Sequence, residues 1–535
     1  MFSRVRSAFM NVVGGIEPVV GMKDVDGPSD ERDRHRHLPH KFPYTRPHFL
    51  QLHTEEEIAV TADHHIRPII VPRDINVMPW SAGYAEAVNA GKSMLNEDQA
   101  CIHRGLLTRQ DRNSSDSHKA PSLPYVYFGI FDGHAGSGAA VAAANQLHHI
   151  IHEKLVDIID HLIPPVVQME KSSRSGLSFF FPGKEVSKES LITGALESAF
   201  WDMDQLIGED KLKYKVNGGC TALAALFIDG KLYVANAGDS RAVLVRHSRS
   251  QPMSYDFTPE SERQRVRRLA ALQPELLGNE YTHLDYCQRP VQKDIGKRIL
   301  YRDWYMTGWG YKTVTPSDLK LPVVHGEGKR SRVLATIGVT RGFGDHELKA
   351  LYSNIPIKPF LLCQPEVKVL HVDDEEEWSE EDVLIMGTDG LWDVTSNERV
   401  AEIITKSFKQ FPQDENRNKY RYTSAAQDLV MSSRGKLTER NWRTSEGKSA
   451  TIDDISVFVI PIVDYKRDHS AWLEQNKALR EQISANMNSI NSNVVVERAV
   501  HNGHPQDEEE EVSLESVMNG DDEIDTSAPL RLELQ

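Results

Sequence analysis

Cysteine is scarce in this sequence. The 535 residues include only four cysteines, and no two of them have the CxxC spacing of a zinc site or a redox motif. They are Cys101, Cys220, Cys287 and Cys363. This usage excludes a disulfide-rich fold and a structural zinc site, and it favours a reducing compartment.

Long hydrophobic runs are also missing. No segment approaches the ~18 apolar residues of a membrane-spanning helix, and the N-terminus lacks the uninterrupted apolar stretch of a signal peptide. We therefore expect a cytoplasmic protein. Hydrophobic residues make up only 39% of the chain, so part of it is expected to be disordered.

Positive charge is outweighed by negative charge. The net charge is -16, and the acid is concentrated near the C-terminus, at residues 507–511 and 521–523. This distribution argues against binding to nucleic acid.

What the chain does contain is a set of carboxylates at the ends of strand-like apolar runs. Asp132 follows 125–131, Asp239 follows 232–238, Asp389 follows 383–388, and Asp453 and Asp454 precede 455–460. A single Asp-Gly pair is more often a turn. Buried aspartates are costly without a partner, so four such positions together favour a metal site. An all-oxygen set prefers Mg²⁺ or Mn²⁺ over zinc.

The remaining patterns predict antiparallel strands and helices. Asp229-Gly230 separates two strand-like runs and predicts a hairpin. Helices are expected over 135–160 and 191–207. Asp202 and Asp204 lie within the second helix, and we interpret both as part of a solvated face.

Domain organisation follows from composition. We expect an N-terminal amphipathic segment and a mostly disordered linker over 1–80, a globular domain over 81–465, and a charged helix with an acidic disordered tail over 466–535. Residues 1–13 place their apolar side chains on one helical face. This segment is predicted either to bind a membrane interface or to pack on its own domain or fray.

Seven ordered motifs resemble the PPM (type 2C) family of metal-dependent serine/threonine protein phosphatases, over roughly 81–463. The motifs are Asn96-Glu-Asp98, Phe131-Asp-Gly-His134, Gly218-Gly-Cys-Thr-Ala222, Ala235-Asn-Ala-Gly-Asp-Ser-Arg241, Thr340-Arg-Gly-Phe-Gly-Asp345, Thr388-Asp-Gly-Leu-Trp-Asp393 and Asp453-Asp-Ile-Ser456. Finer features resemble the animal H, J and M subgroup. The resemblance implies an α+β fold, a central β-sandwich of two antiparallel sheets flanked by helices, with metals at one end.

The resemblance also implies roles for individual residues. Asp132 would bridge two ions, Asp389 and Asp453 would bind one of them, and the Gly133 carbonyl and Glu97 would bind the other directly or through water. Asp239 resembles the ligand of a weaker third ion.

A hydroxide held between the two ions would attack the phosphate directly. His134 would protonate the departing serine or threonine oxygen, or alternatively orient a ligand.

Two positions depart from the family pattern. The arginine that grips substrate phosphate is replaced by Ser93, with Lys92 beside it, and Lys cannot bind phosphate bidentately as Arg does. Asp454 stands where the family has asparagine.

The long interval before Asp389 predicts a flap insertion at about 250–332, with basic and aromatic residues that either read a phosphoprotein surface or simply pack. The subgroup is associated with phosphorylated Rab GTPases on Golgi and related membranes. We therefore expect a phosphoprotein substrate of that class and a peripheral endomembrane location. The alternative is a catalytically silent member that uses the fold as a binding scaffold.

Overall fold

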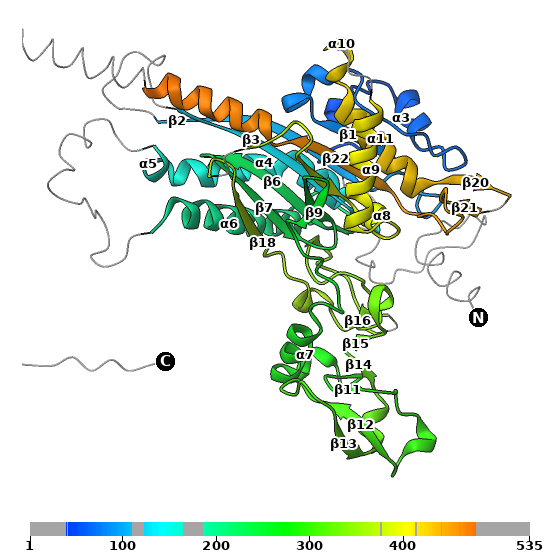
Figure 1. Ribbon diagram of the computed structural model, residues 1–535. Helices are drawn as coiled ribbons and strands as arrows, with labels where there is room; N and C mark the ends of the chain where they lie inside the picture. Colours follow the sequence, from blue (N-terminus) through cyan, green and yellow to red (C-terminus); the bar gives the residue numbers. More distant parts are fainter. Residues whose placement is uncertain are drawn as a thin grey trace, which may run out of the picture. The chain divides into compact units, whose positions relative to one another are not determined.

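A computed structural model describes residues 39, 41–109, 122–163, 186–351, 353–374, 377–411, 415–439 and 441–477. The chain divides after Leu473 into two compact units, and the description below concerns the first. Two antiparallel sheets, each with five strands in the described ranges, pack face to face as a sandwich (Figure 1). The predicted α+β sandwich is confirmed.

Each sheet is antiparallel between all of its neighbouring strands. One sheet has the order β1 (Gly83–Ala87), β22 (Ile455–Pro461), β19 (Val383–Gly387), β8 (Arg241–Arg246) and β9 (Arg249–Pro252). The other has the order β18 (Glu366–His371), β7 (Lys231–Ala237), β6 (Ala222–Ile228), β3 (Ser122–Phe131) and β2 (Gln99–Thr108). Asp229 and Gly230 join β6 to β7 with positive φ angles of 50° and 74°, as the predicted hairpin requires.

Helices cover the outer face of each sheet (Figure 1). Against the second sheet lie α4 (Gly138–Asp157), α5 (Ile159–Leu162) and α6 (Lys188–Asp210); with the first sheet are α8 (Asp389–Trp392), α9 (Asn397–Gln410) and α11 (Arg421–Arg434). The short helix α10 (Glu415–Asn418) comes between α9 and α11 in the chain. Serine side chains cap two of them: Ser187 accepts from Ser190 N at 3.1 Å and Ser396 from Arg399 N at 3.2 Å.

The strand that delivers Asp389 is apolar throughout because both of its faces are covered. Leu384 and Met386 point into the core between the sheets, whereas Val383 and Ile385 pack under α9 and α11. Its position in the middle of the sheet fixes where the following carboxylate lies.

The segment before β1 is folded, so the predicted disordered linker is wrong for residues 41–80. It forms α3 (Glu55–Thr61) and three short 3-10 helices, His48–Leu50, Ile75–Val77 and Pro79–Ser81. Phe49, Leu50 and Met78 are buried in the core between the sheets. Apolar anchors thus tie this charged, histidine-rich stretch to the core. The amphipathic segment predicted at 1–13 lies outside the described residues.

The predicted flap, 250–332, packs with residues 333–361 around a satellite core, which includes Val266, Tyr281, Val333 and Phe360. Its elements are α7 (Arg263–Leu272), β10 (Tyr281–Thr282), β11 (Asp285–Tyr286), β12 (Arg298–Arg302), β13 (Gly310–Thr313), β14 (Leu321–Pro322), β15 (Val324–His325) and β16 (Arg332–Val333). After it, β17 (Phe343–Gly344) pairs with β5 (Gly219–Cys220), which pairs with β4 (Gly133–His134). A hairpin of β20 (Lys436–Thr438) and β21 (Asn441–Arg443) follows α11.

The C-terminal helix begins earlier than predicted. Residues 463–473 are already helical and packed: Tyr465 is buried, and Trp472 Nε1 donates to Ser122 O at 3.2 Å. The predicted domain end at 465 is therefore too early, while the acidic tail lies outside the described residues. In the part of the chain that is described, no helix is both long and apolar enough to cross a membrane.

Candidate active site

Three carboxylates converge at one end of the sandwich. Asp132 follows β3, Asp239 follows β7, and Asp389 begins α8 directly after β19; one oxygen of each lies within 4.8 Å of those of the other two. Thr221 N donates to Asp132 O at 2.9 Å and so fixes the turn after β3. Gly238 has a φ of 141°, and a Cβ there would lie 2.3 Å from Thr221 Cβ, so the turn before Asp239 requires glycine.

The proximity of these groups changes their acidity. Burial raises the pKa of Asp132 and Asp389 well above the usual range, and neighbouring carboxylates raise it further. Burial, with Asp256 nearby, raises the pKa of Asp239 to about 7. Like-charged oxygens gathered at one point fit a divalent cation, and oxygen donors are those that Mg²⁺ and Mn²⁺ prefer.

Asp453, the fourth predicted carboxylate, lies beside the cluster in contact with a lysine. Lys92 Nζ donates to Asp453 Oδ2. Burial alone would lower the pKa of Lys92, but Asp453, Asp389 and Asp132 raise it above its ordinary value. Lys92 therefore stays protonated and contributes positive charge at the edge of the site.

Glu97 and Gly133 lie against each other. Glu97 Oε1 accepts from Gly136 N at 2.8 Å, and a Cβ at Gly133 would lie 2.4 Å from Glu97 O. This close approach explains the glycine in the Asp-Gly-His motif. Burial and the Asp454 carboxylate raise the pKa of Glu97.

His134 is paired with Asp345. The small sheet β4-β5-β17 brings together two segments 211 positions apart, and His134 Nε2 lies 2.7 Å from Asp345 Oδ2. Burial alone would lower the pKa of His134, but the Asp345 carboxylate raises it above its ordinary value. The imidazole thus favours its protonated form, which suits a general acid. Sequence reasoning gave Asp345 no role, although it ends one of the quoted motifs.

Ser93 is engaged in its own loop. Its Oγ donates to Leu95 O at 2.6 Å and accepts from Asn89 Nδ2 at 2.9 Å. Of the two residues predicted at the phosphate position, Lys92 therefore carries the charge and Ser93 shapes the loop.

Asp454 joins two loops of the site. Its carboxylate accepts from Asn89 N at 2.7 Å and from Glu97 N at 3.0 Å. Burial raises its pKa to about 6, with these two N–H groups opposing the rise. The carboxylate that departs from the family pattern thus ties the Glu97 loop to the 451–454 loop.

The sequence is similar to a known family and to several of its members. The family model described as Protein phosphatase 2C matches residues 94–273 and 322–441. Protein phosphatase 1H of Xenopus tropicalis is 45% identical over 516 residues, covering 86% of this chain and 99% of that protein. Human protein phosphatase 1H is 45% identical over 517 residues with the same coverage, and mouse protein phosphatase 1J is 46% identical over 440 residues, covering 78% of this chain and 86% of its own length.

The chain belongs to the protein phosphatase 2C family. Its similarity to the 1H and 1J proteins places it in the animal H/J subgroup, within the H, J and M subgroup that the motifs predicted, and it is a protein serine/threonine phosphatase. The family is metal-dependent, in agreement with the acidic cluster. The gap in the family match, residues 274–321, lies inside the flap.

One aspartate of this phosphatase was misjudged from sequence. Asp204 is buried and paired, not solvated: it accepts from Lys358 Nζ at 2.7 Å and from Gly344 N at 2.9 Å. These bonds fasten α6 to the loop that carries Asp345. Asp202 does lie at the surface, paired with Lys154 at 2.6 Å.

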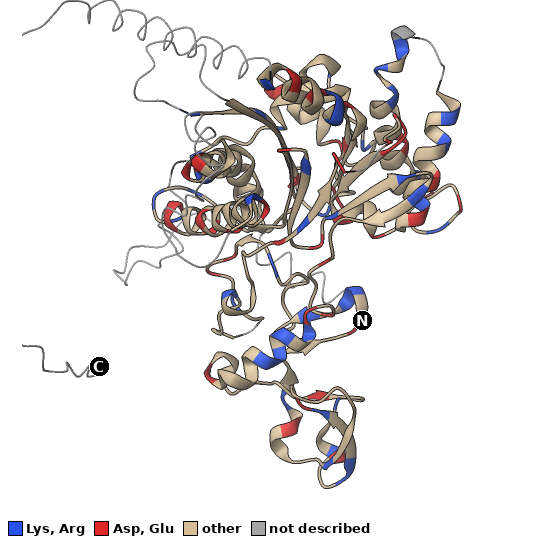
Figure 2. Cartoon of the chain, turned by 60° about the vertical axis from the view of Figure 1, so that its left-hand side comes forward, with Lys and Arg blue, Asp and Glu red and all other residues tan. Residues whose placement is uncertain are grey.

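Two arginines of α7 bind backbone carbonyls within the chain. Arg265 donates to Phe360 O at 3.0 Å, and Arg267 is buried against His283 O at 3.0 Å. Figure 2 shows basic and acidic residues interspersed over the chain. Lys329 reaches the end of the sandwich that carries the acidic cluster, where its Nζ donates to Asp393 Oδ1 at 2.8 Å.

The aromatic residues between 301 and 311 differ in their exposure. Tyr305, Trp309 and Tyr311 are exposed, and the guanidinium of Arg302 lies 4.8 Å from the Trp309 ring. Tyr301 is partly covered, with Lys312 Nζ 5.6 Å from its ring. The exposed group forms an aromatic and basic face on the β11-β12-β13 sheet.

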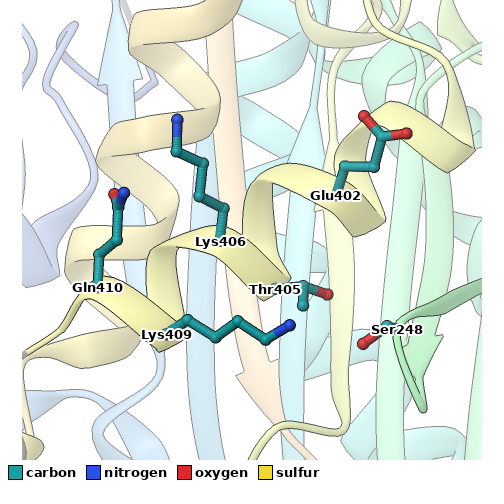
Figure 3. Close-up of a pocket in the computed structure, with 6 residues that line it drawn as sticks. All are labelled: Ser248, Glu402, Thr405, Lys406, Lys409 and Gln410. Carbon is teal, nitrogen blue, oxygen red and sulfur yellow. The ribbon is translucent and has the colours of Figure 1, made fainter.

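A separate hollow of about 430 Å³ lies between α9 and the β8–β9 turn (Figure 3). Its lining residues are Ser248, Glu402, Thr405, Lys406, Lys409 and Gln410. None of the predicted site residues lines it, so it plays no part in the chemistry assigned here.

Proposed function

We propose that this phosphatase hydrolyses phosphoserine and phosphothreonine in proteins by direct attack of water on phosphorus. The observation that carries the proposal is the convergence of Asp132, Asp239 and Asp389 within 4.8 Å, beside the His134–Asp345 pair. These are the parts that phosphoryl transfer to water needs: a place for divalent charge and a proton donor for the leaving oxygen.

Mg²⁺ or Mn²⁺ is the proposed cofactor, with two ions held by Asp132, Asp389, Asp453, Glu97 and the Gly133 carbonyl. A third ion is proposed at Asp239. Divalent ions bound there would lower the pKa of water and neutralise phosphate charge.

The side chains perform the remaining work. Lys92 holds the Asp453 carboxylate and adds a positive charge for the substrate phosphate. His134, kept protonated by Asp345, donates its proton to the serine or threonine oxygen as the P–O bond breaks. Before the reaction, the Asp345 carboxylate stabilises the positively charged His134 ring and fixes its orientation.

We further propose that the substrate is a phosphorylated Rab-class GTPase met at Golgi or related membranes. Support comes from the subgroup resemblance and from the exposed aromatic and basic face of the flap. The proposed location is the cytosol, with peripheral attachment to the membrane through residues 1–13. Such co-localisation raises effective concentration without new contacts.

The test is Mn²⁺-dependent release of phosphate from phosphoserine and phosphothreonine proteins, with Asp132→Ala as the control. We expect release by the wild-type chain and none by the variant. Equal release by both would refute the assigned centre. Binding of phosphoprotein without turnover, in Mn²⁺ and in Mg²⁺, would instead identify a silent scaffold.

A further inference from the structure

Two fully buried arginines come from the folded segment 41–82, which precedes the family match. Arg46 is 3% exposed and Arg67 is 0% exposed. A guanidinium is costly to remove from water, so its presence in both places calls for a specific set of contacts.

Arg67 holds the loop of Asp453 through backbone carbonyls. Its Nη2 donates to Asp453 O at 2.7 Å and its Nη1 to Thr451 O at 2.7 Å. Its Nε donates to Val88 O at 2.6 Å, at the start of the loop that carries Lys92. One side chain thus joins the two loops that supply the Lys92–Asp453 contact.

Arg67 is itself held rigidly. Its guanidinium lies 5.1 Å from the Trp442 ring, and Arg434 Nη1 donates to Arg67 O at 2.5 Å. Its φ of 48° is unusual for a residue other than glycine. A strained backbone conformation at a buried, charged residue persists only where the surrounding contacts hold it in place.

Arg46 makes equivalent contacts to the loop that carries Glu97. Its Nη1 donates to Asn96 O at 3.2 Å and to Asp98 O at 2.6 Å, the carbonyls on either side of Glu97. Its Nε and Nη2 bind both oxygens of Glu86 in β1, at 2.8 and 2.7 Å. Since β1 pairs with β22, this ion pair anchors the Glu97 loop to the sheet.

The two halves are linked through Asp454, which accepts from Glu97 N and Asn89 N. The loops 88–98 and 451–454 therefore form one hydrogen-bonded unit with an arginine on each side. Each arginine binds the backbone of a proposed metal ligand or of its immediate neighbours, and neither reaches the ligand's carboxylate.

We propose that Arg67 and Arg46 are positioning residues for the metal site, and that residues 41–82 brace the catalytic centre as part of the catalytic domain. The inference rests on the proposed ligands Asp453 and Glu97. Groups that orient ligands without binding the metal typically alter metal affinity by 10–100-fold when they are lost.

The experiment compares Arg67→Met, Arg67→Lys and Arg46→Lys in the full chain, with Arg267→Met as the matched control. Arg267 is equally buried and also binds carbonyls, but those of His283 and Arg302 in the flap. Mn²⁺ affinity is measured by calorimetry, thermal unfolding in EDTA reports folding, and kcat is measured at saturating Mn²⁺.

We expect Arg67→Met to raise the Mn²⁺ Kd by about 10-fold or more, with Arg67→Lys and Arg46→Lys showing smaller increases. Arg267→Met should lower the Tm and leave the Kd unchanged. If Arg67→Met does not fold, the two lysine variants carry the same comparison.

A Kd within twofold of wild type in the folded Arg67 variants would overturn the proposal, as would an equal rise in Arg267→Met. Asp453→Ala separates this failure from failure of the proposed function. If Asp453→Ala abolishes Mn²⁺ binding while the arginine variants do not alter it, only the positioning role falls. If Asp453→Ala also binds normally, the ligand assignment falls, and the inference with it.

Discussion

At the scale of single residues, the carboxylates of Asp132 and Asp389 oppose folding when no metal is bound. The pKa of each carboxyl group is higher in the folded than in the unfolded state. The protonated groups therefore favour folding below the unfolded pKa, and this contribution to stability is lost as the pH rises through the folded pKa. At neutral pH, Asp132→Ala or Asp389→Ala should therefore keep or raise the Tm in EDTA, while Mn²⁺-dependent phosphate release falls to background. Unfolding assays in EDTA and phosphate release measure the two effects. Normal turnover in either variant would contradict the assignment.

The His134–Asp345 pair gives a second residue-scale prediction. A general acid matters most when the leaving oxygen is a poor leaving group, as serine is, and contributes typically 10²–10⁴-fold. His134→Gln should therefore lower kcat by about 10²-fold or more on a phosphoserine peptide, and much less on an aryl phosphate. Asp345→Asn should also lower kcat on both substrates, more on the phosphoserine peptide than on the aryl phosphate, but by smaller factors than His134→Gln. Equal losses on both substrates would show that His134 orients a ligand instead.

How far the sequence predicts individual residues depends on where their partners lie. The strand-end positions of Asp132, Asp239 and Asp389 follow from local apolar runs, so the cluster was predictable. The partner of His134 lies 211 positions away, and only the pairing of β4, β5 and β17 reveals it. Asp204 was misjudged for the same reason, since its contacts to Lys358 and Gly344 are tertiary.

At the scale of elements, regular segments were easier to predict than irregular ones. The apolar run of β19 and the hairpin β6–β7 carry strong local signals. Residues 41–80 do not, because this stretch follows no helical or strand period and is held by scattered anchors such as Phe49 and Met78. Buried arginines increase the difficulty, since arginine in a sequence normally indicates exposure.

The flap gives a prediction at this scale. Its core is separate from the cores around the two sheets and is completed by residues 333–361, and it presents Tyr305, Trp309 and Tyr311 to solvent. Replacing residues 250–330 by the shorter segment of a compact family member should preserve hydrolysis of an aryl phosphate. On a phosphorylated Rab GTPase, kcat/KM should fall by at least ~10-fold, equivalent to ~1.4 kcal/mol of transition-state binding.

Point substitutions test the exposed aromatic residues separately from the rest of the flap. Trp309→Ser combined with Tyr311→Ser should reproduce part of the loss on the Rab substrate, and Leu272→Ser, at another exposed flap position, serves as the control. An unchanged ratio of the two activities in the exchanged protein would place specificity outside the flap.

At the scale of the whole molecule, the active site is assembled from nearly the full length of the described chain. Residues from Arg46 to Asp454 meet at one end of the sandwich. Arg46 and Arg67, from the segment before the family match, bind carbonyls of the 88–98 loop, and Asp454, next to β22, binds its N–H groups. The proposed metal site thus depends on contacts from distant parts of the chain, whereas the proposed substrate preference rests on the flap.

Attachment to a membrane is the remaining whole-molecule property, and its prediction rests on residues 1–13 alone. If this segment binds a lipid interface, deleting residues 1–15 should leave kcat/KM on a soluble phosphopeptide unchanged, because the bracing arginines Arg46 and Arg67 lie outside the deleted range. Binding to anionic liposomes in a sedimentation assay should fall, with Phe2→Ser and Phe9→Ser together giving most of the loss. The Arg4 and Arg6 charges should make the binding weaken at high salt. Equal sedimentation of intact and truncated protein would show that the segment packs elsewhere, and the proposed location on endomembranes would then need another anchor.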